Sequence, residues 1–138
     1  ATGRYVNDGY VLAFKLGGTS AMPRIAEKNA TIPEPPSIDA TAAQLENGKY
    51  AYMRTCMVCH GALVVSGGVI PDLRMLSAEK HAIFDAIVYD GVIHGAGMPR
   101  LGDLLTEQDV HDIHAYIVSR ASEDRAATAA AAAAQKQN

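Results

Sequence analysis

Two cysteines and a histidine form the densest cluster of reactive side chains in the sequence. Cys56 and Cys59 are the only cysteines, and His60 follows directly. At the end of a helix, two thiols three residues apart can each add to one of the two vinyl groups on a porphyrin edge. The next imidazole then falls under the ring, where its Nε2 can bind iron. The spacing therefore predicts one covalently attached haem c, with His60 as an axial ligand.

Three other chemistries also use a close pair of cysteines. A thioredoxin-like pair precedes a helix inside a βαβ unit, whereas this pair follows a helical pattern and no such unit is visible. A zinc site needs four ligands, and the sequence has no second pair at finger spacing. A disulfide between these thiols would close a very short loop and gain little stability. All three are weaker interpretations than haem attachment.

The other side of the iron needs a ligand if the protein only carries electrons. Met98 lies 38 residues after His60 in a loop with Gly97 and Pro99. A soft thioether prefers ferrous iron and raises the reduction potential. His94 is the rival ligand, and two histidines would lower the potential. Ligand chemistry alone does not choose between them.

Several further side chains are candidates for supporting roles. His60 needs an acceptor for its Nδ1 proton, and the carbonyl of Pro71 is a reasonable one. Arg74 is either a partner of a haem propionate or a solvated surface charge. Three methionines are expected to fill the core rather than bind iron: Met53, Met57 and Met75.

Three histidines lie outside the haem motif and its loops. His111 and His114 are three residues apart in a helical pattern and could chelate a surface metal. A solvated helix face is the better prediction, because further ligands are missing. His81 has no partner in the sequence and receives no assignment.

Length and charge limit the possible functions. The chain has 138 residues, 49% of them hydrophobic, which suits a single domain with a modest core. Its 12 basic and 15 acidic residues give a net charge of -3 without a basic cluster. These values argue against nucleic acid or an anionic membrane as a partner.

Helical patterns and glycine-rich loops dominate residues 39–122, the expected globular domain. One helix is expected over 41–55 with Asp39 or Thr41 as its cap, a second from Ser77 to Gly91, and a third after a capping box at 106–109. Residues 1–22 read as a β-hairpin with a turn at 7–9, and 23–38 as a proline-bearing linker. The alanine-rich tail, 123–138, is expected to be frayed helix or disorder.

The order of these features resembles a class I cytochrome c over about residues 40–121. The resemblance rests on Cys56-x-x-Cys59-His60-Gly61, Pro71-Asp72-Leu73, Gly97-Met98-Pro99 and two helices carrying Gly48, Tyr52 and Tyr116. It implies a mostly α-helical fold around the haem, with a short N-terminal hairpin added. It also implies axial ligation by His60 and Met98, the carbonyl of Pro71 as partner of His60, and a helix crossing where Gly48 meets Tyr116.

The N-terminal segment adds a second resemblance. Residues 8–18 followed by a proline-bearing linker and the haem motif resemble the end of a quinohaemoprotein alcohol dehydrogenase dependent on pyrroloquinoline quinone (PQQ). In such proteins a β-propeller binds PQQ with calcium or a lanthanide and passes single electrons to a cytochrome domain. The resemblance implies that residues 1–22 are the last propeller strands and that the chain itself is not catalytic.

This resemblance also suggests partners and a compartment. The expected electron donor is the PQQ-binding propeller domain. The expected acceptor is a small redox protein or a membrane oxidase or quinone system. Haem attachment of this type implies export in bacteria, so the expected location is the periplasm. A free-standing cytochrome c serving another oxidoreductase or oxidase is the alternative.

Overall fold

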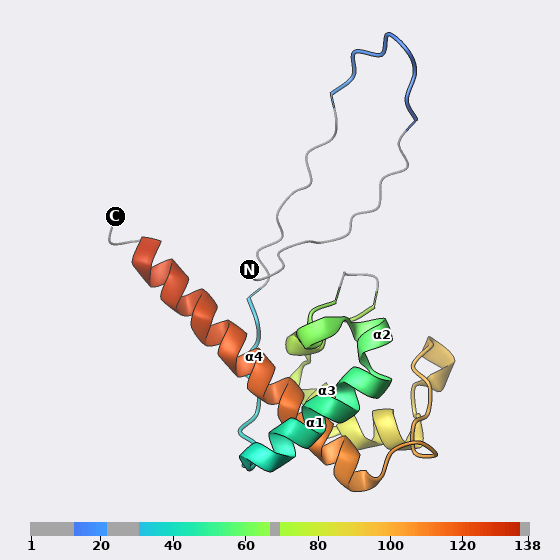
Figure 1. Cartoon of the computed structure of the whole chain (residues 1–138), viewed down its shortest axis with the longest axis vertical. Helices are drawn as coiled ribbons and strands as arrows, with labels where there is room; N and C mark the ends of the chain where they lie inside the picture. Colours follow the sequence, from blue (N-terminus) through green and yellow to red (C-terminus); the bar gives the residue numbers. More distant parts are fainter. Residues whose placement is uncertain (1–12, 22–30, 67–69, 136–138) are drawn as a thin grey trace.

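The computed structural model describes residues 13–21, 31–66 and 70–135, and these residues form helices and loops without a strand (Figure 1). The mostly helical architecture is confirmed. The expected hairpin turn at 7–9 lies outside the described residues, and 13–16 form no strand. The α-helices are α1 (Ala42–Thr55), α2 (Met57–His60), α3 (Ala78–Ala82) and α4 (Glu107–Gln135). The shorter turns are η1 (Ala62–Val64), η2 (Leu73–Met75), η3 (Ala86–Asp90) and η4 (His94–Ala96).

A capping box begins α1. The Thr41 hydroxyl accepts a hydrogen bond from the Gln44 backbone N–H at 3.3 Å, and the Gln44 side chain accepts one from the Thr41 N–H at 3.0 Å. These two bonds satisfy backbone donors that the first helical turn leaves unpaired. Thr41, rather than Asp39, is therefore the cap of this helix.

Helices α1 and α4 cross at Gly48, which has no side chain to separate them. A Cβ atom at Gly48 would lie 1.9 Å from the carbonyl oxygen of Asp112. The resemblance placed Tyr116 opposite Gly48, but the nearest atoms are the backbone of Asp112 and Ile113. The ring of Tyr116 instead packs against Tyr52, with the ring centroids 5.5 Å apart. The crossing is thus backbone against backbone, with the aromatic pair one turn away.

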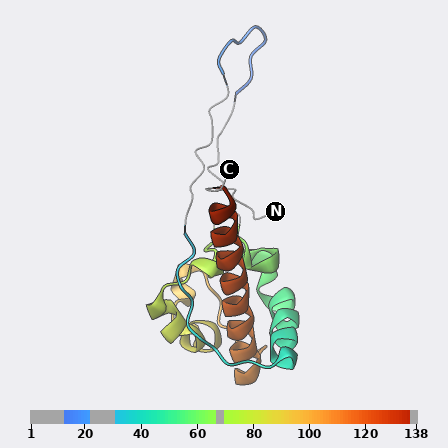
Figure 2. The same cartoon turned by 90° about the vertical axis from the view of Figure 1, so that its left-hand side faces the viewer.

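The hydrophobic core lies where α1, η1, η3 and α4 meet (Figures 1 and 2). Tyr52, Val64, Ile113 and Ile117 have no measurable exposure. Apolar side chains of this size contribute about 1.5–3 kcal/mol each when they are fully buried. Other members of the core come from the second half of the chain: Phe84, Ile87, Val88, Leu101, Leu105, Val110 and Tyr116.

The segment between Ser77 and Gly91 is not the continuous helix that its spacing predicts. The α-helix α3 ends at Ala82, Ile83 leaves the helical region (φ -114°, ψ 22°), and the chain continues as the π-helical turn η3. The predicted stop at Gly91 is confirmed. Gly91 adopts φ 74°, a left-handed conformation that glycine reaches without strain.

The last helix, α4, is longer than expected. Its capping box is confirmed, because the Asp109 N–H donates to the Thr106 hydroxyl at 3.1 Å and the Thr106 N–H to the Asp109 carboxylate at 2.9 Å. The helix then runs through the alanine-rich stretch to Gln135 (Figure 2). Alanine has the highest helix propensity of any residue, so this stretch has no local reason to end the helix. The helix therefore passes without a break through the boundary proposed after residue 122.

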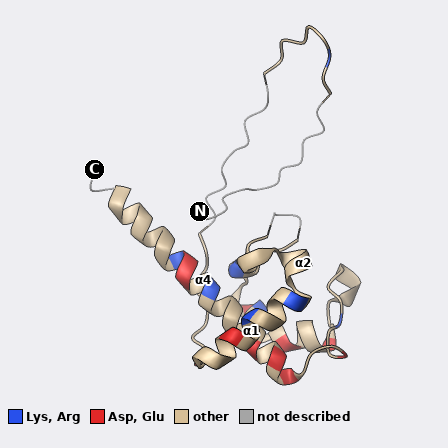
Figure 3. Ribbon diagram, in the orientation of Figure 1, with Lys and Arg blue, Asp and Glu red and all other residues tan. Residues whose placement is uncertain are grey.

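None of the helices in the described ranges has the length and apolar character that a membrane crossing requires. Lys and Arg positions are spread over α1, α4 and the loops between them, with Asp and Glu positions interspersed (Figure 3). Basic and acidic residues are thus mixed along the described part of the domain.

Candidate functional site

The two cysteines lie at the junction of α1 and α2 and have different surroundings. Cys56 ends α1 and precedes α2, and its side chain is buried, with the sulfur 3.3 Å from the Thr55 hydroxyl oxygen. Burial raises the pKa of the Cys56 thiol. Cys59 lies within α2 and is exposed, and neither cysteine is in a disulfide. Both thiols are therefore available for attachment, one from inside the fold and one from the surface.

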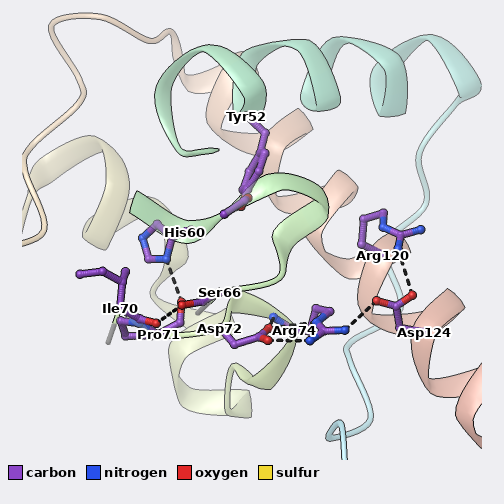
Figure 4. A network of polar contacts seen from close by, with 10 residues as sticks. Tyr52, His60, Ser66, Ile70, Pro71, Asp72, Arg74, Arg120 and Asp124 are labelled. Carbon is purple, nitrogen blue, oxygen red and sulfur yellow. Dashed lines mark hydrogen bonds and ion pairs between the residues drawn. The ribbon is translucent and has the colours of Figure 1, made fainter. Parts of the chain in front are cut away.

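The imidazole of His60 is held from one side. Its Nδ1 lies 2.9 Å from the carbonyl oxygen of Pro71, and the residue is only 7% exposed (Figure 4). A carbonyl can only accept, so Nδ1 carries a proton, and in the neutral ring the lone pair is then on Nε2. This is the tautomer that binds a metal through Nε2. The predicted contact between His60 and Pro71 is confirmed.

A sharp turn follows the histidine. Gly61 has φ 79°, and a Cβ there would lie 2.0 Å from the carbonyl oxygen of Val65. The Tyr52 hydroxyl donates a hydrogen bond to the Gly61 carbonyl at 2.8 Å (Figure 4). Burial of Tyr52 raises its pKa, so the phenol keeps its proton. α1 thus holds the backbone beside His60 directly.

Arg74 is not a solvated surface charge, which corrects one of the two sequence-based interpretations, whereas its pairing with a haem propionate stays a prediction. Its side chain is 10% exposed, and its Nε and Nη2 donate to the two oxygens of Asp72 at 3.0 and 2.6 Å. Its Nη1 donates to Asp124 on α4 at 2.9 Å. All three guanidinium nitrogens already donate to carboxylates of this chain. We therefore assign Arg74 a structural role.

The two candidates for the other axial position differ in their surroundings. Met98 is half-buried and packs against the hydrophobic core that includes Cys56. His94 is exposed, and its Nδ1 lies 3.1 Å from the carbonyl oxygen of Gly91. The thioether is thus directed to the core and the imidazole to the surface loop. This difference favours Met98 over His94 as the sixth ligand.

The three other methionines were expected in the core, and one of them is not. Met53 is 39% exposed, although it directly follows the fully buried Tyr52 on α1. Met57 is partly buried against the core, and Met75 is half-buried. The prediction is therefore wrong for Met53.

The histidine face of α4 is not uniformly solvated, contrary to prediction. His114 stacks on Phe84, with ring centroids 4.3 Å apart, and its Nε2 lies 2.8 Å from Nδ1 of His81. Burial and the neighbouring His81 and His111 lower the pKa of His114 to about 4. Only His111 is exposed, at 51% of its side chain. No group of three or more metal-binding side chains occurs among the described residues.

The donor set around the motif fits a haem. The free Nε2 of His60 supplies the nitrogen ligand, and two unpaired thiols lie within four residues of it. Large apolar side chains near the motif are exposed, namely Val58 at 88%, Leu63 at 53% and Ile70 at 38%. Apolar surface of this kind favours a hydrophobic partner such as a porphyrin.

Sequence reasoning did not find Asp124, the partner of Arg74 on α4. The residue was grouped with the alanine-rich tail, yet only 9% of its surface is exposed. One signal was present in the sequence: Arg120 and Asp124 are four residues apart, which is the spacing of a helical ion pair. That spacing indicated a helix continuing beyond residue 122.

Comparisons with known proteins agree with this geometry. Residues 43–117 match the family described as cytochrome c oxidase, cbb3-type, subunit III. The quinohemoprotein alcohol dehydrogenase ADH-IIG of Pseudomonas putida is 42% identical over 111 residues, which cover 80% of this chain and 15% of that protein. Cytochrome c550 of Pseudomonas aeruginosa is 34% identical over 82 residues, 54% of each protein.

A solved structure gives the same relationship. The quinohemoprotein alcohol dehydrogenase ADHIIG of Pseudomonas putida HK5 superimposes with a TM-score of 0.63 at 42% identity. The match covers 78% of this chain and 16% of the solved chain. The described domain thus corresponds to a small part of the dehydrogenase that it resembles.

Proposed function

Because the chain belongs to the cbb3-type cytochrome c family, we propose that it carries single electrons from the reduced PQQ of an alcohol dehydrogenase to a downstream acceptor. The chain is a cytochrome c domain, and its relatives are quinohemoprotein alcohol dehydrogenases. Haem electron transfer is therefore its general function, and the domain is not the catalytic part of such an enzyme. The donor, the acceptor and the roles of individual residues are our proposal.

The hydrogen bond from His60 to the Pro71 carbonyl is the observation that carries the proposal. It fixes the imidazole with Nε2 free, directly after two thiols at attachment spacing. Cys56 and Cys59 would attach the cofactor covalently, and His60 would bind its metal. Bound haem would supply an iron that alternates between the ferric and ferrous states.

Met98 would occupy the second axial position. Its thioether would stabilise the reduced state relative to a second histidine and would close the site to substrates. The support is its half-buried place against the core, whereas His94 is exposed and contacts the Gly91 carbonyl. With both axial positions filled, the residues of this chain would exclude reactants and allow only electron transfer.

The donor would be a dehydrogenase domain that holds PQQ with calcium or a lanthanide. The names of the dehydrogenase relatives support this donor, and the chain would take up electrons one at a time. The acceptor would be a small redox protein or a membrane oxidase or quinone system. Attachment of haem c implies a periplasmic location for both partners.

A free-standing carrier is the second candidate. The 34% identity to cytochrome c550 over 54% of that protein supports it. Both candidates use the same residues at the site and differ in the electron donor. A PQQ dehydrogenase would reduce the first carrier in the presence of alcohol and would leave the second oxidised.

A visible absorption spectrum of the purified chain, made in a host that attaches haem c, tests the site. We expect sharp reduced bands with dithionite and the weak red band of sulfur-ligated ferric haem. Sharp bands without the red band would remove Met98 as ligand. A colourless chain from that host would overturn the proposal and return Cys56 and Cys59 to thiol chemistry.

A second experiment tests the donor. The oxidised chain is mixed with a PQQ alcohol dehydrogenase from which the cytochrome domain has been removed, and alcohol is then added. We expect the reduced bands to form at a rate that rises with the concentration of the dehydrogenase. No reduction under these conditions, with dithionite reduction intact, would favour the free-standing carrier.

A further inference from the structure

A line of polar contacts connects the far part of α4 with the acceptor of the haem-site histidine (Figure 4). Asp124 on α4 accepts from Arg74, and Arg74 donates to both oxygens of Asp72. Asp72 directly follows Pro71, whose carbonyl accepts from His60. The peptide unit between Pro71 and Asp72 therefore links the Asp72–Arg74 ion pair to the imidazole of His60.

The segment that carries the Pro71 carbonyl has little structure of its own. The following element, η2, is a single 310 turn of three residues. Its cap is Asp72, which accepts from the Arg74 backbone N–H at 3.0 Å. Short 310 turns are held weakly by their own hydrogen bonds. The position of this turn therefore depends on contacts from outside.

Asp124 supplies that outside contact through a largely buried ion pair with Arg74. The residue is 9% exposed and the Arg74 side chain 10%, so water competes little for the ion pair. The second oxygen of Asp124 accepts from Arg120 at 2.9 Å, which fixes the carboxylate on its own helix. An ion pair between a planar guanidinium and a carboxylate that is held by several hydrogen bonds has a well-defined geometry.

We propose that Arg74 and Asp124 are positioning residues that set the strength of the hydrogen bond from His60 to the Pro71 carbonyl and thereby tune the reduction potential. This inference rests on the proposed function, since it needs a haem bound by His60. Neither residue touches the metal ligand. Both act through Asp72 on the acceptor carbonyl.

The direction of the effect follows from ligand chemistry. A good acceptor at Nδ1 makes the imidazole more basic, which stabilises ferric iron and lowers the potential. Release of the Pro71 segment weakens this bond. Substitutions that break the contact between Arg74 and Asp124 should therefore raise the reduction potential, whichever of the two residues is replaced.

The charge of the removed group has a separate effect, and its sign distinguishes the two mechanisms. Loss of the Asp124 carboxylate favours the ferrous state, because negative charge stabilises ferric iron. Loss of the Arg74 guanidinium has the opposite electrostatic effect. Charge alone therefore predicts shifts of opposite sign for Asp124→Asn and Arg74→Gln, whereas positioning predicts a rise for both.

The experiment measures the reduction potential of the haem-loaded chain for Asp124→Asn, Asp124→Glu and Arg74→Gln. Glu123→Gln is the matched control, because it removes a neighbouring carboxylate that is 58% exposed and contacts Arg120 and Ser119 rather than Arg74. We expect Asp124→Asn and Arg74→Gln each to increase the ratio of ferrous to ferric haem, measured at one fixed solution potential, about threefold or more. A tenfold change corresponds to 59 mV for one electron. Asp124→Glu should lie closer to the parent, and Glu123→Gln should match it.

Opposite shifts for Asp124→Asn and Arg74→Gln, or shifts no larger than that of Glu123→Gln, would overturn the proposal. If Arg74→Gln does not yield a folded haem protein, Arg74→Lys decides, because it keeps the positive charge but cannot form the forked contacts with Asp72 and Asp124. A raised potential in Arg74→Lys supports positioning, and a parental potential opposes it, since charge alone predicts no shift for this variant. Failure of the proposed function is distinct, since the parent chain would then show no haem c spectrum.

Discussion

Nδ1 of His81 lies 2.8 Å from Nε2 of His114, so two imidazoles on α3 and α4 share one hydrogen bond beneath the stacked ring of Phe84. One ring must donate and the other accept, so the accepting nitrogen must be unprotonated. Protonation of the acceptor would leave two donors facing each other. The contact therefore ties α3 to α4 only while the accepting ring is unprotonated.

This pair makes stability depend on pH. Burial lowers the pKa of both rings, that of His114 from 6.5 to about 4, so the folded chain binds fewer protons than the unfolded chain. The stabilisation is complete above about pH 6.5 and is lost as the pH falls toward 4. We expect urea unfolding to show a loss of about 2 kcal/mol across this window, after allowance for partial exposure of the ring.

His114→Phe should flatten this dependence because it keeps the stacking on Phe84 and removes the titrating ring. His111→Gln is the matched control, since His111 is half exposed on the same helix. Its pH profile should follow that of the parent. A parental slope in His114→Phe would show that other groups cause the loss at low pH.

Gly48→Ala should strongly destabilise the fold. The added Cβ would lie 1.9 Å from a backbone oxygen of α4, so the two helices must separate. Overpacking of this kind costs about 1–3 kcal/mol, and a backbone neighbour places it at the upper end. Thermal unfolding measures the loss. The control is Gly95→Ala, because no atom lies within 4 Å of its added Cβ, and a similar loss there would contradict the explanation.

The two tyrosines that pack against each other should respond differently to removal of their hydroxyl groups. The Tyr52 hydroxyl donates to the Gly61 carbonyl, whereas the Tyr116 hydroxyl is buried without a hydrogen-bond partner among the described residues. Tyr52→Phe should cost about 1 kcal/mol in the free energy of unfolding, and Tyr116→Phe should be neutral or stabilising. Equal losses in chemical denaturation would show that Tyr116 has a partner such as a buried water.

Met98→Ala should leave the haem attached and lower the reduction potential, because the thioether ligand is lost while the cysteine links remain. The ferrous form should then bind carbon monoxide rapidly. His94→Ala is the comparison and should retain the parental potential and the weak red band. The reverse pattern would make His94 the ligand.

Cys56→Ala and Cys59→Ala should each sharply reduce the yield of haem-loaded protein, because the chain has a modest core and gains stability from its cofactor. Pyridine haemochrome absorbance per milligram of chain measures the yield. Met53→Ala, an exposed position on α1, controls for expression. Full yield with tightly held haem in either cysteine variant would show that the missing attachment is dispensable.

The features that the sequence predicted correctly are those set by near neighbours. The caps at Thr41 and Thr106 and the stop at Gly91 each depend on residues within a few positions. His60 and Pro71 are 11 residues apart in the sequence. Their contact was predicted from the need of the imidazole for an acceptor together with the family resemblance. Interactions between residues close in the sequence leave a recognisable local pattern.

The features that sequence reasoning missed depend on distant partners. Arg74 and Asp124 are 50 residues apart, and His81 and His114 are 33 apart. A single charged or aromatic side chain carries no sign of which distant partner it will meet, because the packing of η2 and α3 against α4 decides it. The exposure of Met53 has the same origin, since helical spacing does not reveal which face is covered.

The length of α4 has a consequence for anyone shortening this protein. A chain trimmed at the point where alanine begins to dominate would end near residue 122 and would lose Asp124 together with its hold on Arg74. The Thr128 hydroxyl also donates to the Asp124 carbonyl at 2.8 Å, which secures that turn of the helix. A minimal redox module should therefore keep the helix through residue 128, and the exposed alanines beyond it are the part available for a linker or fusion.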